Sequence, residues 1–285
     1  IILDGAPLGV NTANSGDGGA IQLHAASSLV ARSYTVFERN RAYDGSGGAI
    51  ACHGCHSIAL QGGTSFQNNT AGRDGGALSV THPVSREITS AESQFKGNVA
   101  TSGDGGAVFI MNSFDATGSW NSSRDHFENN MAKKGSGGAI AAMGTHVSLD
   151  NTACQRNHAP AGGGGCIFWE PLATTMAGED VWQSLSPVST AESQVLIEQE
   201  NQAGYGTTFG SGAASLRVKS GNSRNFATAA PGGASLTPSP RIEILDFSGS
   251  VMKGIKLDGV IVTAHLTNTG ASPLSSSTRI FGCSG

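Results

Sequence analysis

Residues 11–21 read NTANSGDGGAI and residues 40–50 read NRAYDGSGGAI, so an Asn, an Ala, a Gly pair and a closing Ala-Ile recur at the same offsets. The Asn-x-Ala element returns along most of the chain, at Asn11, Asn40, Asn69, Asn98, Asn130, Asn157 and Asn201. Subtraction gives gaps of 29, 29, 29, 32, 27 and 44 residues. A period of this length is typical of stacked structural units.

Each repeat also carries a large residue before the Asn and a small one after it. The residue three positions before the Asn is Leu8, Phe37, Phe66, Phe95, Phe127 and Cys154 in the first six copies. The residue eight or nine positions after it is Ala20, Ala49, Ala77, Ala107, Ala139 and Cys166. The seventh copy is degenerate, because Glu198 holds the Phe position, and we expect the array to end there.

The composition narrows the class of protein. The 285 residues include 41 Gly, and only 13% are charged, which is unusual for an enzyme but follows from periodic glycine turns. A net charge of −4 gives no electrostatic footprint for nucleic acid. No apolar run approaches the length of about 18 residues that spans a bilayer. The chain starts IILDGAPLGV, so we expect a mature or excerpted piece of a longer protein.

The repeat predicts an all-β fold. The second copy holds three short alternating stretches bounded by turn residues, GGAIAC, SIALQG and TSFQNN. Three strands per repeat predict triangular coils of a parallel β-helix, with about six coils in residues 1–213. A helical bundle or an α/β fold is disfavoured, because no window has a period of 3.6 residues and Gly recurs every few positions.

The repeated residues acquire structural roles in such coils. Aromatic rings stacked inside the coils would provide much of the buried apolar area, and they belong to Phe37, Phe66, Phe95 and Phe127. Side-chain amides at one corner would bond neighbouring coils and tolerate a left-handed turn, at Asn40, Asn69, Asn98, Asn130 and Asn157. The small Ala positions would leave room for the Phe rings across the interior.

The pattern changes after the sixth copy. Residues 171–194 are rich in Ser, Thr, Met and Ala and predict a long loop inserted in the last coil. RIEILDF (241–247) and GVIVTAHLT (259–267) then predict strands of an antiparallel sheet. We therefore expect residues 214–285 to begin an Ig-like β-sandwich that two clear strands do not complete.

The combination of Gly-Gly-Ala-Ile with Phe-x-x-Asn, at Phe37 to Asn40 with Gly47 to Ile50 and again in later copies, resembles the repeats of the chlamydial polymorphic outer-membrane proteins. Secreted β-helix proteins of algae and other protists carry similar repeats, and Cys-x-x-Cys after Gly-Gly-Ala-Ile is closer to those, including mastigoneme-like filament proteins. The resemblance covers about residues 8–213. It implies a right-handed parallel β-helix outside the cell, used for adhesion or for building surface structures.

Four of the five cysteines predict disulfides. CHGCH at residues 52–56 matches the haem c attachment pattern, but a macrocycle has no space in a filled solenoid, so we favour a Cys52–Cys55 disulfide and expect no cofactor. Cys154 and Cys166 replace the Phe and Ala that should touch inside one coil, which predicts a second disulfide. Cys283 then lacks a partner within this chain. Disulfides favour an oxidising, extracellular compartment.

Other polar residues suggest chemistry less strongly. Acids that recur before a Gly pair could bind Ca²⁺, at Asp17, Asp74 and Asp104, but Ser46 and Ser136 substitute for them, so capped turns are favoured. A row of imidazoles near strand ends could hold a metal, at His24, His53, His82 and His146, although surface histidines explain it better. Neither acids nor bases converge on one face, so we expect no catalytic site.

These expectations lead to a structural function. The sequons NNT at Asn68 and NSS at Asn121 predict N-glycans if the source is eukaryotic. We expect a segment of a glycosylated extracellular cell-surface or flagellar-appendage filament, whose partners are other subunits of the filament or copies of itself. The alternatives are an adhesin that binds a surface glycan or protein, and a polysaccharide lyase or hydrolase, which often uses the same fold.

Overall fold

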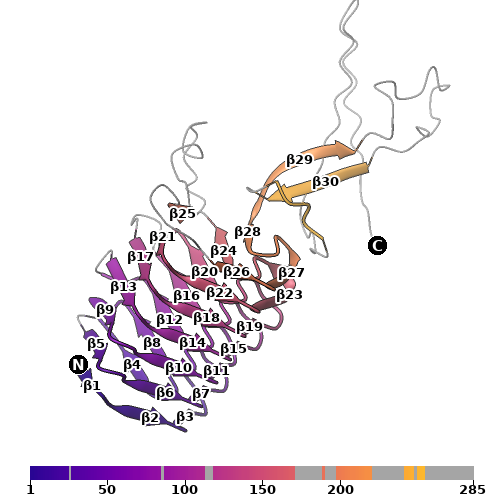
Figure 1. The fold of residues 1–285 in the computed structure, drawn as a ribbon. Helices are drawn as coiled ribbons and strands as arrows, with labels where there is room; N and C mark the ends of the chain where they lie inside the picture. The colour runs from indigo at the N-terminus through magenta and orange to yellow at the C-terminus, as the bar shows by residue number, and fades with distance from the viewer. Residues whose placement is uncertain are drawn as a thin grey trace, which may run out of the picture. The chain divides into compact units, whose positions relative to one another are not determined.

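The computed structural model describes residues 1–25, 27–84, 87–112, 118–170, 188–189, 197–219, 241–246 and 249–253. Within these residues the chain is all-β and contains no helix. Four parallel sheets of seven strands form a β-helix, and two further strands pair antiparallel. Figure 1 shows successive coils of the β-helix lying side by side in chain order from β1 to β28.

Each coil contributes one strand to each of four sheets, which we name A to D. Sheet A contains β1 (Ile2–Asp4), β5 (Ser28–Arg32), β9 (Ser57–Leu60), β13 (Glu87–Ala91), β17 (Gly118–Ser123), β21 (Thr145–Asp150) and β25 (Val188–Ser189). Sheet B contains β2 (Pro7–Gly9), β6 (Val36–Glu38), β10 (Ser65–Gln67), β14 (Gln94–Lys96), β18 (His126–Glu128), β22 (Ala153–Gln155) and β26 (Ile197–Gln199).

The other two sheets complete each coil. Sheet C contains β3 (Thr12–Ala13), β7 (Arg41–Ala42), β11 (Thr70–Ala71), β15 (Val99–Ala100), β19 (Met131–Ala132), β23 (His158–Gly163) and β27 (Gln202–Tyr205). Sheet D contains β4 (Ile21–Leu23), β8 (Ile50–His53), β12 (Leu78–Thr81), β16 (Val108–Met111), β20 (Ile140–Met143), β24 (Ile167–Glu170) and β28 (Phe209–Ser211).

The parallel β-helix is confirmed, but the prediction of three strands per coil is wrong. The fourth strand is the short one of sheet C, which has two residues in five of the seven coils, such as Thr70–Ala71. A stretch that short cannot show the alternation by which strands are recognised in sequence. It follows the repeated Asn directly, so the Asn corner separates two strands, those of sheets B and C.

One apolar core runs through the solenoid. The inward residues of each strand stack on their equivalents in the next coil, in sheet D for example Ile50, Leu78, Val108, Ile140 and Ile167. The Gly pair closes the turn into sheet D. A Cβ on Gly76 would lie 2.1 Å from the carbonyl oxygen of Gly106, so this position has no space for a side chain. Gly75 before it has a φ of +62°, which favours glycine.

The chain leaves the β-helix through an antiparallel pair. β29 (Ala213–Lys219) pairs with β30 (Arg241–Asp246), so the predicted strand at 241–247 is present and its partner follows the last coil directly. The predicted strand at 259–267 and most of the β-sandwich lie outside the described residues. Most of the predicted loop 171–194 does as well, although β25 lies within that range and pairs with β21.

Candidate functional site

The repeated asparagines form a hydrogen-bonded ladder along one corner, from Asn11 to Asn201. The side-chain oxygen of Asn98 accepts hydrogen bonds from the backbone N and Nδ2 of Asn69, both at 3.0 Å. Nδ2 of Asn98 donates to the Phe66 carbonyl and to Oδ1 of Asn130, both at 3.0 Å. The same bonds recur in the other coils, at Asn40, Asn69, Asn130 and Asn157. The buried amides thus join each coil to both neighbours.

The left-handed turn expected at the asparagines lies one residue earlier. Arg39, Asn68, Asn129 and Arg156 have positive φ values between 53° and 54°, and Gly97 takes this position in the coil between Asn68 and Asn129. The turn directs these side chains to the surface while the next residue points inward. Because an exposed residue tolerates many side chains, this position varies between repeats and escapes sequence analysis.

The four phenylalanines stack inside as expected. Their ring centroids are 4.7 Å apart for Phe37 and Phe66, 4.9 Å for Phe66 and Phe95, and 4.6 Å for Phe95 and Phe127. The planes of these pairs differ by 4° or less, and each ring is fully buried. The stack is therefore the aromatic centre of the core.

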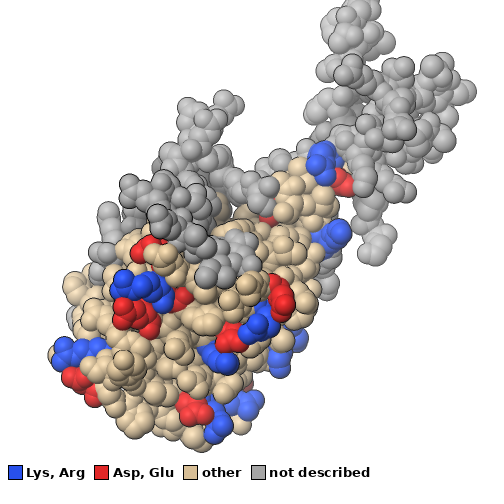
Figure 2. Space-filling model, in the orientation of Figure 1, with Lys and Arg blue, Asp and Glu red and all other residues tan. Residues whose placement is uncertain are grey.

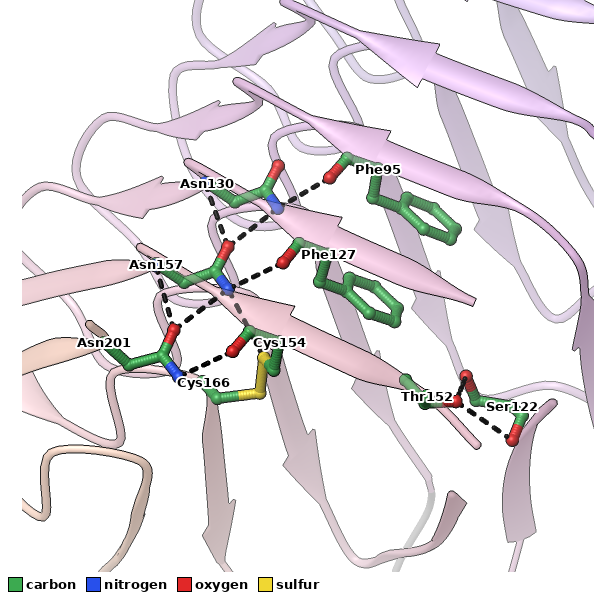
Figure 3. The surroundings of a disulfide bond; sticks show 9 residues. All are labelled: Phe95, Ser122, Phe127, Asn130, Thr152, Cys154, Asn157, Cys166 and Asn201. Atoms are coloured by element: carbon green, nitrogen blue, oxygen red, sulfur yellow. Dashed lines mark hydrogen bonds between the residues drawn. A yellow bond between two sulfur atoms is a disulfide. The ribbon is translucent and has the colours of Figure 1, made fainter. Parts of the chain in front are cut away.

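A disulfide continues the core where the phenylalanine stack ends. Cys154 pairs in register with Phe127 and is bonded to Cys166, which holds the small-residue position (Figure 3). The second predicted disulfide, Cys52–Cys55, is also present, with both cysteines buried. Cys52 holds the inward position of Leu23 and Val80, so this pair belongs to the core.

The repeated acids before the Gly pair form a second ladder. Oδ1 of Asp17 accepts the backbone N–H of Ser46 at 2.7 Å, Oδ1 of Asp74 that of Asp104 at 2.9 Å, and Oδ1 of Asp104 that of Ser136 at 2.6 Å. Each carboxylate therefore caps the next coil and not its own turn. Burial raises the pKa of Asp104, and the neighbouring charge of Asp74 adds to this increase.

Neither the acids nor the histidines assemble into a metal centre in the described part of the chain, where no three His, Cys, Asp or Glu side chains could hold an ion. The rings of His53 and His82 lie edge to face with centroids 5.7 Å apart. Nδ1 of His53 is 2.9 Å from Oγ1 of Thr81. His146 lies on a different sheet, in β21.

One buried carboxylate was missed from the sequence. Asp125 is 1% exposed and holds the position that is Thr35, Thr64 or Thr152 in other coils. It accepts hydrogen bonds from the Ser93 backbone N–H at 2.7 Å and from Oγ of Ser122 at 2.6 Å. Figure 3 shows Ser122 beside Thr152 of the next coil, with their hydroxyl oxygens 3.0 Å apart. Burial raises the pKa of Asp125 to about 6.

The surface carries charges of both signs. On the face in Figure 2, basic and acidic side chains lie close together and do not separate into single-sign regions. Glu128 bridges two coils, because it pairs with Lys96 at 3.1 Å and with Arg156. The hydrogen bond from Lys96, followed by that from Arg156, lowers the pKa of Glu128. Within the described residues, no helix is long and apolar enough to cross a membrane.

The two sequons lie on the outside of the β-helix. Asn68 is exposed at the corner between sheets B and C. Asn121 lies in β17, next to Thr89 and Ser148 of the neighbouring coils, and is partly buried. Both positions differ from the inward Asn ladder, so a glycan on either would leave the core intact.

Comparison with known proteins supports the repeat assignment. Residues 63–81 match the Chlamydia polymorphic membrane protein repeat, a stretch that includes Phe66, Asn69 and the Gly75–Ala77 turn. No curated protein and no solved structure matches the chain significantly. The matched repeat and the parallel β-solenoid together fit a β-helix protein like the polymorphic membrane proteins. They indicate a surface or adhesin-like protein, and the two disulfides indicate an oxidising environment.

Proposed function

We propose that this protein is an extracellular structural protein, a glycosylated segment of a cell-surface or flagellar-appendage filament. The asparagine ladder is the observation that carries the proposal. Its buried amides bond to both neighbouring coils along one corner of the β-helix, and the Phe stack runs in the same direction inside it. The residues that define the repeat are thus used in contacts between coils. This is expected of a structural rod whose outer surface makes the contacts with other molecules.

The acids support a non-enzymatic role. A polysaccharide lyase or hydrolase needs carboxylates that converge on one open patch. Asp17, Asp74 and Asp104 instead accept backbone N–H groups of the following coil, which occupies an oxygen of each carboxylate. Incubation with acidic and neutral polysaccharides should release neither reducing ends nor unsaturated products. Turnover that disappears when these acids are replaced would instead support a polysaccharide lyase or hydrolase.

The filament proposal is tested on native material. Electron microscopy should show regularly repeating fibres that contain the protein, and peptide mass spectrometry should find glycans on Asn68 and Asn121. Partners would be other subunits of the filament or further copies of the protein. Isolated short particles that stay monomeric on dilution, with bare polypeptide mass, would overturn the proposal.

The alternative is an adhesin, which the match to the polymorphic membrane protein repeat favours. An adhesin should bind a surface glycan or protein through a face that glycans leave free. Saturable binding of the purified monomer to a surface glycan or protein, competed by unlabelled protein, would distinguish an adhesin from a filament segment.

A further inference from the structure

The outer face of sheet D carries an apolar patch on three consecutive coils. Phe109, Ala141 and Phe168 pair in register, point away from the core and are nevertheless 5%, 0% and 5% exposed. The outward residues at this position in the first three coils are Gln22, Ala51 and Ser79. Two aromatic rings therefore distinguish these coils from the rest of the sheet.

Tyr205 and three methionines complete this patch, which we call the outer patch. Tyr205 of β27 packs into it and is 8% exposed, while Met111 and Met143 flank it. The ring of Tyr205 lies against Gly163, where an added Cβ would come within 2.4 Å of the ring. Its hydroxyl donates a hydrogen bond to the Ser211 carbonyl at 3.1 Å. Burial raises the pKa of Tyr205 to about 12, so it is neutral at physiological pH.

Met252 is the remaining member of the outer patch, and it comes from the segment after β30. Its backbone N–H donates to the Ile244 carbonyl at 2.9 Å, and Val251 bridges to Leu245. Oδ1 of Asp246, at the end of β30, accepts the Ser250 N–H at 2.8 Å. Met252 is thus held by the same antiparallel unit as β29 and β30.

We propose that the outer patch is the docking site that fastens the segment following the β-helix to the solenoid, with Met252 as the side chain it receives. A two-stranded antiparallel pair is marginally stable in water without a surface to pack on. The outer patch gives this unit a contact with the solenoid through Met252, because aromatic rings and thioethers pack well against each other. This inference is independent of the filament proposal, since an adhesin would need the same joint.

Hydrogen exchange of the full chain, followed by mass spectrometry, tests the docking. The double variant Phe109→Ser with Phe168→Ser gives both coils the residue that Ser79 already provides in the third coil. Exchange in residues 241–253 should accelerate by about tenfold or more, while peptides of residues 57–81 keep their protection. Ala51→Ser, in the same row but outside the patch, is the matched control and should leave residues 241–253 protected.

A second variant approaches the contact from the other side. Met252→Lys leaves the solenoid untouched and places a charge against the patch, so it should expose residues 241–253 in the same way. Unchanged protection in both the double variant and Met252→Lys would overturn the proposal. Protection that rises with protein concentration would also overturn it, because the patch would then be filled by the segment of a second copy.

Discussion

At position 125 a carboxylate replaces the hydroxyl that Thr35, Thr64 and Thr152 provide in other coils. Those threonines donate to nearby carbonyls, as Thr64 does to Gln61 at 2.8 Å. Oγ1 of Thr35 also accepts the backbone N–H of Ala6, in the preceding coil, at 3.4 Å. Oδ1 of Asp125 accepts the equivalent N–H, that of Ser93. A threonine can therefore make the local bonds of Asp125 without a charge. The buried carboxylate destabilises its coil once it ionises.

Replacing Asp125 by Thr should change how stability depends on pH. The folded pKa of about 6 lies above the ordinary value of 3.8 for an Asp carboxyl, so the stabilising effect of the proton is complete below about pH 3.8 and is lost as the pH rises through 6. The free energy of unfolding that is lost in this way approaches about 3 kcal/mol at pH 8. Thermal melting at pH 4.5 and 8 should show that Asp125→Thr gains stability over the wild type at pH 8. An equal difference at both pH values would contradict this.

The position of an asparagine in the ladder should decide how much its side chain contributes to the free energy of unfolding. Asn98 is fully buried and bonds to Asn69, Phe66 and Asn130, whereas Asn11 is exposed and its side chain bonds only to Asn40 among the described residues. Asn98→Ala leaves several buried partners unsatisfied and should cost about 4 kcal/mol, against about 1 kcal/mol for Asn11→Ala. Chemical denaturation of both variants measures the difference. Equal losses would mean that burial and the number of partners do not decide how much an asparagine of the ladder contributes.

At the scale of the element, the sixth coil replaces an aromatic contact by a covalent one. Cys154→Phe combined with Cys166→Ala restores the residues of the preceding coil, Phe127 and Ala139, and would extend the ring stack by one. The disulfide contributes about 3 kcal/mol by closing its loop. A reductant should lower the melting temperature of the wild type more than that of the double variant, which keeps only Cys52–Cys55. If the reductant lowers both melting temperatures equally, the loss of stability comes from Cys52–Cys55.

The predictable elements are those whose residues are fixed by contact with their own copies. Phe95, Asn98 and Cys154 could be placed from the period alone, because each touches the equivalent residue one coil away. Asp125 could have been found only as the exception in a column of Thr and Ser. Phe109 and Phe168 could not be interpreted, because their partner Met252 lies far along the chain and outside the repeat.

For the molecule as a whole, the period implies that coils are interchangeable. Each coil packs only on its neighbours, so the stability of a solenoid is a sum of units and of the interfaces between them. The register supports this, since Phe66 pairs with both Phe37 and Phe95, and Ala71 with both Ala42 and Ala100. Removing one full period should therefore preserve every ladder.

Deleting residues 69–97 tests this modularity. The deletion removes 29 residues and joins Asn68 to Asn98. The asparagine ladder and the Phe stack then continue without a gap, with Phe66 against Phe127, and both disulfides remain. The shortened chain should fold, keep its β circular dichroism and melt cooperatively at a lower temperature, because one coil and one interface are lost. Deleting residues 69–92 is the control: it removes 24 residues, joins Asn68 to Ser93 and shifts the later columns by five positions, which places polar residues in the core. That chain should fail to fold, and equal behaviour of the two deletions would show that the register does not hold the coils together.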